Sequence, residues 1–137
     1  MHYVVVFDTN ILLSALLSTT GNPFRCLALA KIGQVESVTC QEILDEFAEK
    51  LLVKFKFSEE MTQAAVEEVR EFSRIVEISG TLKTVAADPD DDMVIECAVL
   101  GHATHIVTGD KHLLALTNYQ QIAIAKAIEF ITLLSSV

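Results

Sequence analysis

Four aspartates crowd into five positions just before an apolar stretch of the chain. Asp88, Asp90, Asp91 and Asp92 precede the run MVIECAVL, and no Lys or Arg follows any of them within eight residues. Like charges this close together repel one another unless a cation lies between the carboxylates. Carboxylate oxygens are the ligands that Mg²⁺ and Mn²⁺ prefer in proteins. The stretch therefore suggests a metal site at the start of a buried helix.

Three further acids stand at the ends or beginnings of predicted elements. Asp8 directly follows the apolar run YVVVF, and Asp110 follows HIVTG. Glu46 lies in the second turn of a helix predicted after a short strand at 34–38. In a parallel sheet the carboxyl ends of the strands share one edge, so we expect Asp8, Asp91 and Asp110 to project there with Glu46 nearby. Four such acids predict a site for Mg²⁺ or Mn²⁺.

Each acid taken alone also has a structural interpretation. An Asp immediately before a helix usually accepts a hydrogen bond from a free backbone N–H, which would explain each of these aspartates separately. Thr39 and Glu42 form the T-x-x-E pattern of a capping box, so we expect Glu42 to be structural and Glu46 to be free for other work. Capping gives no reason to bring several acids to one point, and the set as a whole favours a metal site.

Competing motifs do not occur in the sequence. Asp88, Asp90 and Asp92 imitate the start of an EF-hand loop, but Met93 stands where Gly is needed and Val99 where the loop needs Glu. The patterns GxxxxGK[ST], GxGxxG, GxSxG and HExxH do not occur. The sequence therefore gives no indication of a calcium loop, a nucleotide-binding loop of these types, a serine hydrolase or a zinc protease.

Short apolar runs alternate with longer helical patterns along the whole chain. Strands are predicted at 3–7, 34–38, near 76–79, within 104–110 and at 122–125. Helices are predicted at 11–18, 22–33, 39–55, 58–76, 92–101, 111–116 and 126–134. This alternation predicts a single domain over residues 1–137, a three-layer α/β/α sandwich around a mostly parallel sheet of four to five strands.

The composition limits the classes of partner. Ten basic and nineteen acidic residues give a net charge of −9, which argues against a broad basic surface for nucleic acid. Hydrophobic residues make up 51% of the chain, yet no apolar run reaches the roughly 18 residues of a membrane span. The N-terminal stretch has no basic region typical of a secretory signal, and Cys26, Cys40 and Cys97 have no CxxC spacing. We expect a cytoplasmic protein with buried, reduced thiols and no membrane partner.

The order of these motifs resembles the PIN domain nucleases, and most closely the branch described as toxin components of toxin–antitoxin systems. The stretches that carry the resemblance are VVFDTNILLSALL, ILDEF, DPDDDMVIECA and IVTGDKHLL, and it covers nearly the entire chain. The resemblance implies a ribonuclease that uses one or two Mg²⁺ or Mn²⁺ ions to hydrolyse RNA phosphodiester bonds. It also implies an antitoxin protein as a partner.

The resemblance assigns roles to individual residues. The acids that hold metal and carry catalysis are Asp8, Glu46, Asp91 and Asp110, and the supporting polar positions are Asn10 and Thr108. Asp91 is assigned by counting back seven residues from Ala98, and Asp90 or Asp92 could take the metal instead. A few cations near these acids could guide a phosphate backbone; they are Arg25, Lys50, Lys54, Lys56 and Lys111. A narrow, weakly basic site of this kind favours single-stranded RNA over a duplex.

Two other functional classes compete with the nuclease. The net charge of −9 favours a non-catalytic PIN-fold scaffold that binds a partner protein, whereas the four intact acids favour catalysis. A phosphoryl-transfer protein with Asp8 as phospho-acceptor is disfavoured, because the haloacid-dehalogenase type needs a second Asp where Asn10 stands. The apolar helices within 11–32 could also support a homodimer.

Overall fold

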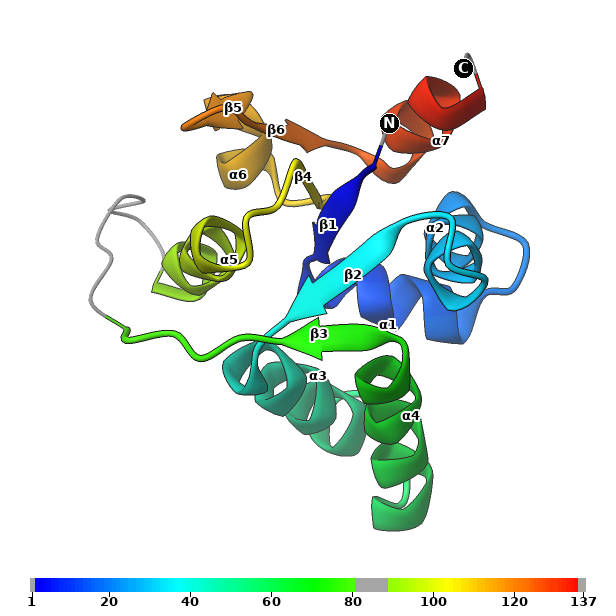
Figure 1. The fold of residues 1–137 in the computed structure, drawn as a ribbon. Helices are drawn as coiled ribbons and strands as arrows, with labels where there is room; N and C mark the ends of the chain where they lie inside the picture. The colour runs from blue at the N-terminus through cyan, green and yellow to red at the C-terminus, as the bar shows by residue number, and fades with distance from the viewer. Residues whose placement is uncertain (1, 81–88, 136–137) are drawn as a thin grey trace.

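The computed structural model describes residues 2–80 and 89–135 (Figure 1). Within these residues, six strands form one sheet in the order β3-β2-β1-β4-β6-β5. The strands are β1 (Val4–Phe7), β2 (Glu36–Thr39), β3 (Ser73–Ile75), β4 (His105–Val107), β5 (Asn118–Tyr119) and β6 (Ile122–Ala125). All neighbouring strands pair in parallel except β5, which runs antiparallel to β6 at one edge.

Helices cover both faces of this sheet. They are α1 (Thr9–Leu17), α2 (Asn22–Lys31), α3 (Gln41–Val53), α4 (Glu59–Glu71), α5 (Pro89–Leu100), α6 (Lys111–Leu116) and α7 (Ala127–Ser135). Figure 1 shows α5 and α6 on one side of the strands and α1, α2 and α7 on the other, with α3 and α4 beneath β2 and β3. This arrangement is the expected three-layer α/β/α sandwich. None of the helices in the described residues is long and apolar enough to cross a membrane.

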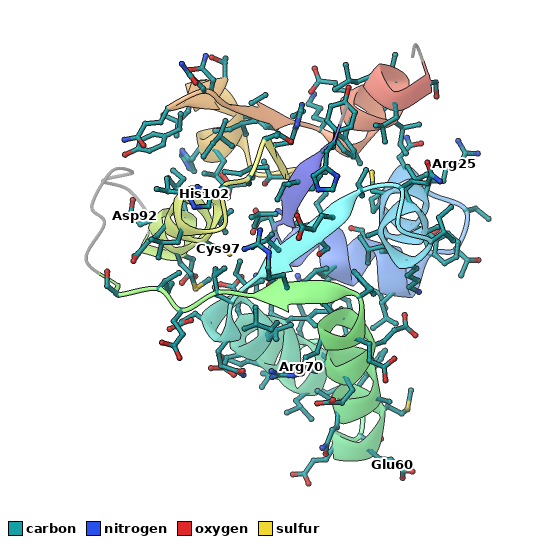
Figure 2. The ribbon with its side chains drawn as sticks, viewed as in Figure 1. Arg25, Glu60, Arg70, Asp92, Cys97 and His102 are labelled. Carbon is teal, nitrogen blue, oxygen red and sulfur yellow. The ribbon has the colours of Figure 1, made fainter. Side chains whose placement is uncertain are left out.

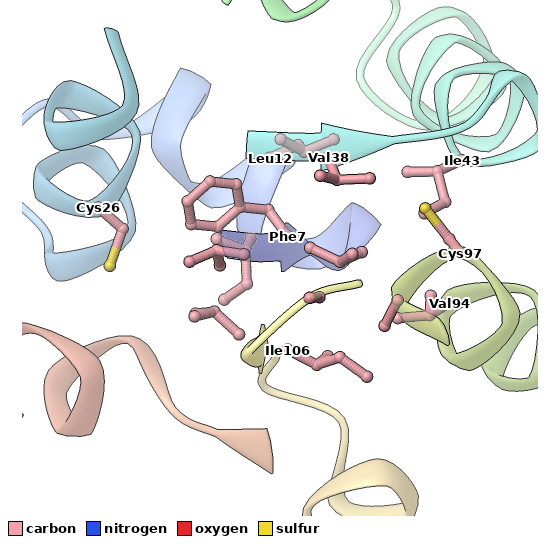
Figure 3. Packing of buried hydrophobic residues seen from close by; sticks show 14 of the residues in the cluster. Phe7, Leu12, Cys26, Val38, Ile43, Val94, Cys97 and Ile106 are labelled. Atoms are coloured by element: carbon pink, nitrogen blue, oxygen red, sulfur yellow. The ribbon is translucent and has the colours of Figure 1, made fainter. Parts of the chain in front are cut away.

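The central strand β1 explains why the first apolar run of the sequence has no polar alternation. Val6 pairs with Val38 of β2 on one side and with Ile106 of β4 on the other, and all three side chains are fully buried. A strand with neighbours on both edges and helices on both faces must be apolar throughout. Figure 3 shows Phe7 within this core.

Two boundaries in the sheet differ from the sequence prediction. The helix predicted at 58–76 ends at Glu71, and the next strand, β3, begins at Ser73 rather than near 76–79. The strand β5 was not predicted, and it raises the number of strands from the expected four or five to six. This strand follows from a turn in which Gln120 and Gln121 both adopt positive φ angles. Turns of this kind are usually predicted from Asn or Gly, so two glutamines give no such signal in the sequence. The predicted acid Asp88 lies outside the described residues.

The predicted capping box at the start of α3 is wrong. Thr39 belongs to β2, and the residue that caps α3 is Cys40, whose side chain makes no capping hydrogen bond. A strand conformation at Thr39 keeps its hydroxyl away from the first turn of the helix. The interpretation of Glu42 as a capping residue therefore has no support in the structure.

The three cysteines are free and buried, as predicted. Figure 3 shows Cys26 on α2 and Cys97 on α5, on opposite sides of β1. Burial raises the pKa of the Cys26 thiol to about 12, so this side chain acts as a small apolar group of the core.

Candidate active site

Asp8 lies where β1 passes into α1, and its carboxylate is almost fully bonded. One oxygen, Oδ1, accepts a hydrogen bond of 2.7 Å from the backbone N–H of Thr9, so Asp8 is the N-cap of α1. The other, Oδ2, accepts a hydrogen bond of 2.6 Å from the Thr108 hydroxyl and a longer one, 3.4 Å, from the Asn10 amide. The residue is 7% exposed. An Asp used only as a cap would not need the two side-chain donors as well.

Thr108 joins Asp8 to Asp110. Its hydroxyl, fully buried after the end of β4, donates to Asp8 and accepts a hydrogen bond of 2.9 Å from the backbone N–H of Asp110. The Asp110 carboxylate caps α6, with 2.7 Å to the N–H of His112. Asn10 makes a second bridge, because its Oδ1 accepts from the N–H of Gly109 at 3.3 Å. The parallel pairing of β1 and β4 thus brings both predicted supporting residues between the two acids.

The negative charge of the Asp8 carboxylate is destabilised by its surroundings. Burial raises the pKa of Asp8 above its ordinary value, and the negative charge of Asp110 raises it further. The hydrogen bonds from Thr108 and Thr9, and the positive charge of Lys50, lower the pKa without cancelling the effect of burial. A cation beside the carboxylate would relieve this cost, and its oxygens suit a hard divalent ion.

Glu46 forms an ion pair with a lysine whose charge also influences Asp8. It lies on α3, which packs against α1, and its side chain is 18% exposed. Lys50, one turn further along the same helix, places its Nζ 3.9 Å from Glu46 Oε1. The positive charge of Lys50 also lowers the pKa of Asp8. Lys50 therefore interacts electrostatically with both Glu46 and Asp8.

Three aspartates of the cluster that precedes MVIECAVL lie within α5. The helix begins at Pro89, and Asp90, Asp91 and Asp92 occupy its first turn. Asp90 is exposed, whereas Asp91 and Asp92 are 4% and 8% exposed. The helix packs against β1, β2 and β4, and Asp8 and Asp110 follow the first and the last of these strands.

Glu96 is a buried acid that the sequence analysis did not single out. Its carboxylate accepts hydrogen bonds from the N–H and hydroxyl of Ser79, at 2.6 and 2.7 Å, and from the N–H of Gly80 at 3.1 Å. It therefore ties the segment after β3 to α5. A lone Glu in the apolar run MVIECAVL was the signal available in the sequence. Asp92 is four residues before Glu96 and shares its side of the helix.

The described residues do not contain a ready-made metal cluster. Over 2–80 and 89–135, no three His, Cys, Asp or Glu side chains form a group that could hold an ion. The acids that the structure visibly couples are Asp8 and Asp110. Among the predicted phosphate guides, Arg25 is remote: Figure 2 shows it on α2, on the opposite side of the molecule from Asp92.

Comparison with known proteins identifies the family. The described residues form an α/β protein in which two linked acids lie at the carboxyl edge of a parallel sheet. A sequence model of the PIN domain matches residues 4–112, so the chain belongs to the PIN domain family. PIN domains are generally nucleases that use divalent metal ions and act on RNA.

Solved structures agree on the fold. Three chains match, among them the crystal structure of PAE2754 from Pyrobaculum aerophilum. That match has 14% sequence identity and a TM-score of 0.63, and it covers 97% of this chain and 90% of the other. At this identity the likeness shows the fold alone. No curated protein matches the sequence.

The dual hydrogen bonding of Thr108 leads to a first prediction. Thr108→Val removes a buried hydroxyl that serves two partners, so we expect a loss of about 1–3 kcal/mol in the free energy of unfolding. Because Asp8 also loses its shortest side-chain contact, any metal-dependent cleavage should fall by about 10–100-fold, as for other residues that orient metal ligands. Urea unfolding and RNA cleavage measure the two effects.

Thr62→Val is the matched control for this substitution. Thr62 is also a buried threonine, but it lies on α4, and within the described part of the chain its Oγ1 has no hydrogen-bond partner. It should leave cleavage unchanged and stability equal or higher. Equal effects of the two substitutions on cleavage would contradict the role of Thr108.

Proposed function

We propose that this protein is an endoribonuclease that uses Mg²⁺ or Mn²⁺ to hydrolyse phosphodiester bonds in single-stranded RNA, and that it is the toxin of a toxin–antitoxin system. The observation that carries the nuclease proposal is the link from Asp8 through Thr108 to Asp110 at the carboxyl ends of β1 and β4. This link holds together two acids whose negative charges repel each other. The protein that contains them belongs to a family of nucleases. Such an arrangement costs free energy in an apo protein and is useful once a cation is bound.

The residues present fit a hard divalent ion. The candidate ligands are the carboxylates of Asp8, Glu46, Asp91 and Asp110, with Asp90 and Asp92 as alternatives in the first turn of α5. All of them offer oxygen, the donor that Mg²⁺ and Mn²⁺ prefer. A bound divalent ion supplies an acidified water as nucleophile and stabilises the charge that develops on the scissile phosphate, so no histidine base is needed.

The remaining residues of the site hold these acids in place. Thr108 and Asn10 donate to the same oxygen of Asp8, which fixes the orientation of the carboxylate, and the N–H of Thr9 fixes its other oxygen. The Asp110 carboxylate is held by backbone N–H groups at the start of α6, those of His112 and Leu113, rather than by flexible side chains. A site built on strand ends and helix starts is rigid enough to position a phosphate.

The charge of the protein supports a limited, metal-dependent affinity for RNA. Binding of two divalent ions would change the formal net charge from −9 to −5, which reduces the repulsion of an anionic substrate without removing it. The affinity must then come from local contacts at the site rather than from a basic surface. Short single-stranded segments, which can enter a narrow site, suit this arrangement better than a duplex.

An apolar pocket supports the antitoxin part of the proposal. Helices α1 to α4 enclose a pocket of about 470 Å³ with Leu12, Leu16, Phe47 and Met61 among its lining residues. Leu16 and Met61 are 39% and 55% exposed. The outer side of α4 is strongly acidic, with Glu59, Glu60, Glu67, Glu68 and Glu71.

Apolar side chains beside acidic ones fit a protein segment whose apolar residues are flanked by Lys or Arg. We take this segment to be part of the antitoxin. The same pocket is the observation that favours the alternative function, a scaffold that binds a protein and does not cleave. A homodimer through α1 and α2 would appear as a doubled mass in light scattering.

The decisive experiment separates the nuclease from the scaffold. Labelled single-stranded RNA is incubated with the purified protein in EDTA, and then with Mn²⁺ or Mg²⁺ in excess. We expect no cleavage in EDTA and endonucleolytic products once the ion is restored, because the acids alone offer no acidified water. Cleavage that persists in EDTA, or a protein inert with both ions, would contradict the proposal.

A further inference from the structure

Lys50 is a cation placed among the acids of the candidate site. Its Nζ lies 3.9 Å from Glu46 Oε1, and α3, which carries both residues, packs against α1, the helix that Asp8 caps. The side chain is 45% exposed, so it reaches the site from the solvent side and is free to move. Lys54 has the same charge but lies one turn further along, where its Nζ sits 5.5 Å from the centre of the Phe55 ring.

The pairing of Lys50 with Glu46 conflicts with metal binding by Glu46. A carboxylate that coordinates a divalent ion has little negative charge left for an ammonium group, and the ion and the ammonium group repel each other. An exposed ion pair of this length contributes little to stability, so it is easily broken. The lysine would then be left beside the site without its carboxylate partner, and a phosphate of the substrate would be an anion available to it.

We propose that Lys50 exchanges partners during the catalytic cycle: it neutralises Glu46 in the metal-free protein and binds a phosphate of the RNA once the ion has taken Glu46. This inference rests on the proposed function. If this exchange occurs, Lys50 weakens the binding of the metal ion, because it competes with the ion for Glu46. The same lysine strengthens the binding of RNA, because it attracts a phosphate. A lysine with a purely structural role, or one that merely adds to the general positive charge, would not show both.

Lys50→Met tests the exchange with two measurements. Titration calorimetry should show Mn²⁺ binding tighter by about five-fold or more, because the ammonium group beside Glu46 no longer repels the ion. Steady-state cleavage at saturating Mn²⁺ should show KM for a short single-stranded RNA raised by about five-fold or more with kcat less affected. The salt dependence of kcat/KM should weaken by about 0.7 in the log–log slope, which corresponds to one phosphate contact.

The controls separate this inference from the function on which it rests. Arg25→Met makes the same change in net charge on α2, remote from the site, and should leave Mn²⁺ affinity and KM unchanged, and Lys50→Arg should restore KM. Tighter Mn²⁺ binding together with weaker RNA binding in Lys50→Met alone supports the exchange. Unchanged or weaker Mn²⁺ binding in Lys50→Met overturns it while the nuclease stands. A wild-type protein that binds no Mn²⁺ overturns the proposed function and this inference together.

Discussion

Asp8→Asn should abolish cleavage while the protein stays folded. The substitution removes the charge of the most tightly held acid of the site, and we expect the rate to fall by about a thousand-fold, the scale at which preorganised electrostatic groups act. The fold should survive, because an Asn oxygen can still accept from the N–H of Thr9 and cap α1. Cleavage of labelled RNA and a thermal melt of the same preparation measure both properties.

The stability of this variant has a predicted sign. In the folded protein the pKa of Asp8 is raised, so ionisation of this carboxyl above its unfolded pKa costs folding free energy. Asn carries no charge and avoids that cost, so without metal ions Asp8→Asn should melt at the same temperature as the wild type or higher at neutral pH. The charge-matched control is Glu60→Gln at the far end of α4, which Figure 2 shows remote from α5. Wild-type cleavage by Asp8→Asn would mean that the activity comes from elsewhere.

Asp91→Asn should lower cleavage by about a hundred-fold or more, while Asp90→Asn stays within about three-fold of the wild type. The two residues are neighbours in the first turn of α5, but Asp91 is 4% exposed and Asp90 is exposed. Asp91 shares a side of the helix with Ile95 and Ala98, which are fully buried. That side carries the acid toward the interior, where the strand ends lie.

Asp92→Asn tests whether Asp92, rather than Asp91, is the metal ligand in α5. Asp92 is also buried, yet it lies on the side of Glu96, whose carboxylate holds the backbone at Ser79 and Gly80. We expect its replacement to affect stability more than cleavage. Single-turnover rates of the three variants at saturating Mn²⁺, with melts as controls, decide among the three positions. A larger loss of rate in Asp90→Asn or Asp92→Asn than in Asp91→Asn would move the metal ligand to that residue.

The parts of the fold that the sequence predicts are those in which burial forces a continuous pattern. The apolar runs of β1 and β6 and the helical pattern of α6 appear in the structure with their expected limits to within one residue. The polar residues that follow β1 and β4 meet because parallel neighbours end at the same edge. The approach of Asp8 to Asp110 could therefore be predicted without coordinates.

Other features depend on contacts that one sequence does not reveal. At the edges of the sheet β3 and β5 are short and half-exposed, so neither carries an apolar run that marks its limits. Three consecutive aspartates look alike until the burial of α5 distinguishes Asp91 and Asp92 from Asp90. The pairing of Glu46 with Lys50 was visible as an i,i+4 spacing, but only the structure shows that their helix, α3, packs against α1, which Asp8 caps.

A thermal melt with and without Mn²⁺ tests most directly whether these acids share an ion. A ligand that binds the folded state alone raises its stability by RT ln(1 + [L]/Kd), about 2.7 kcal/mol at a hundred-fold excess over Kd. The account predicts that millimolar Mn²⁺ raises the melting temperature of the wild type by several degrees and leaves that of Asp8→Asn nearly unchanged. An unchanged wild-type melting temperature, or an equal rise in Asp8→Asn, would contradict it.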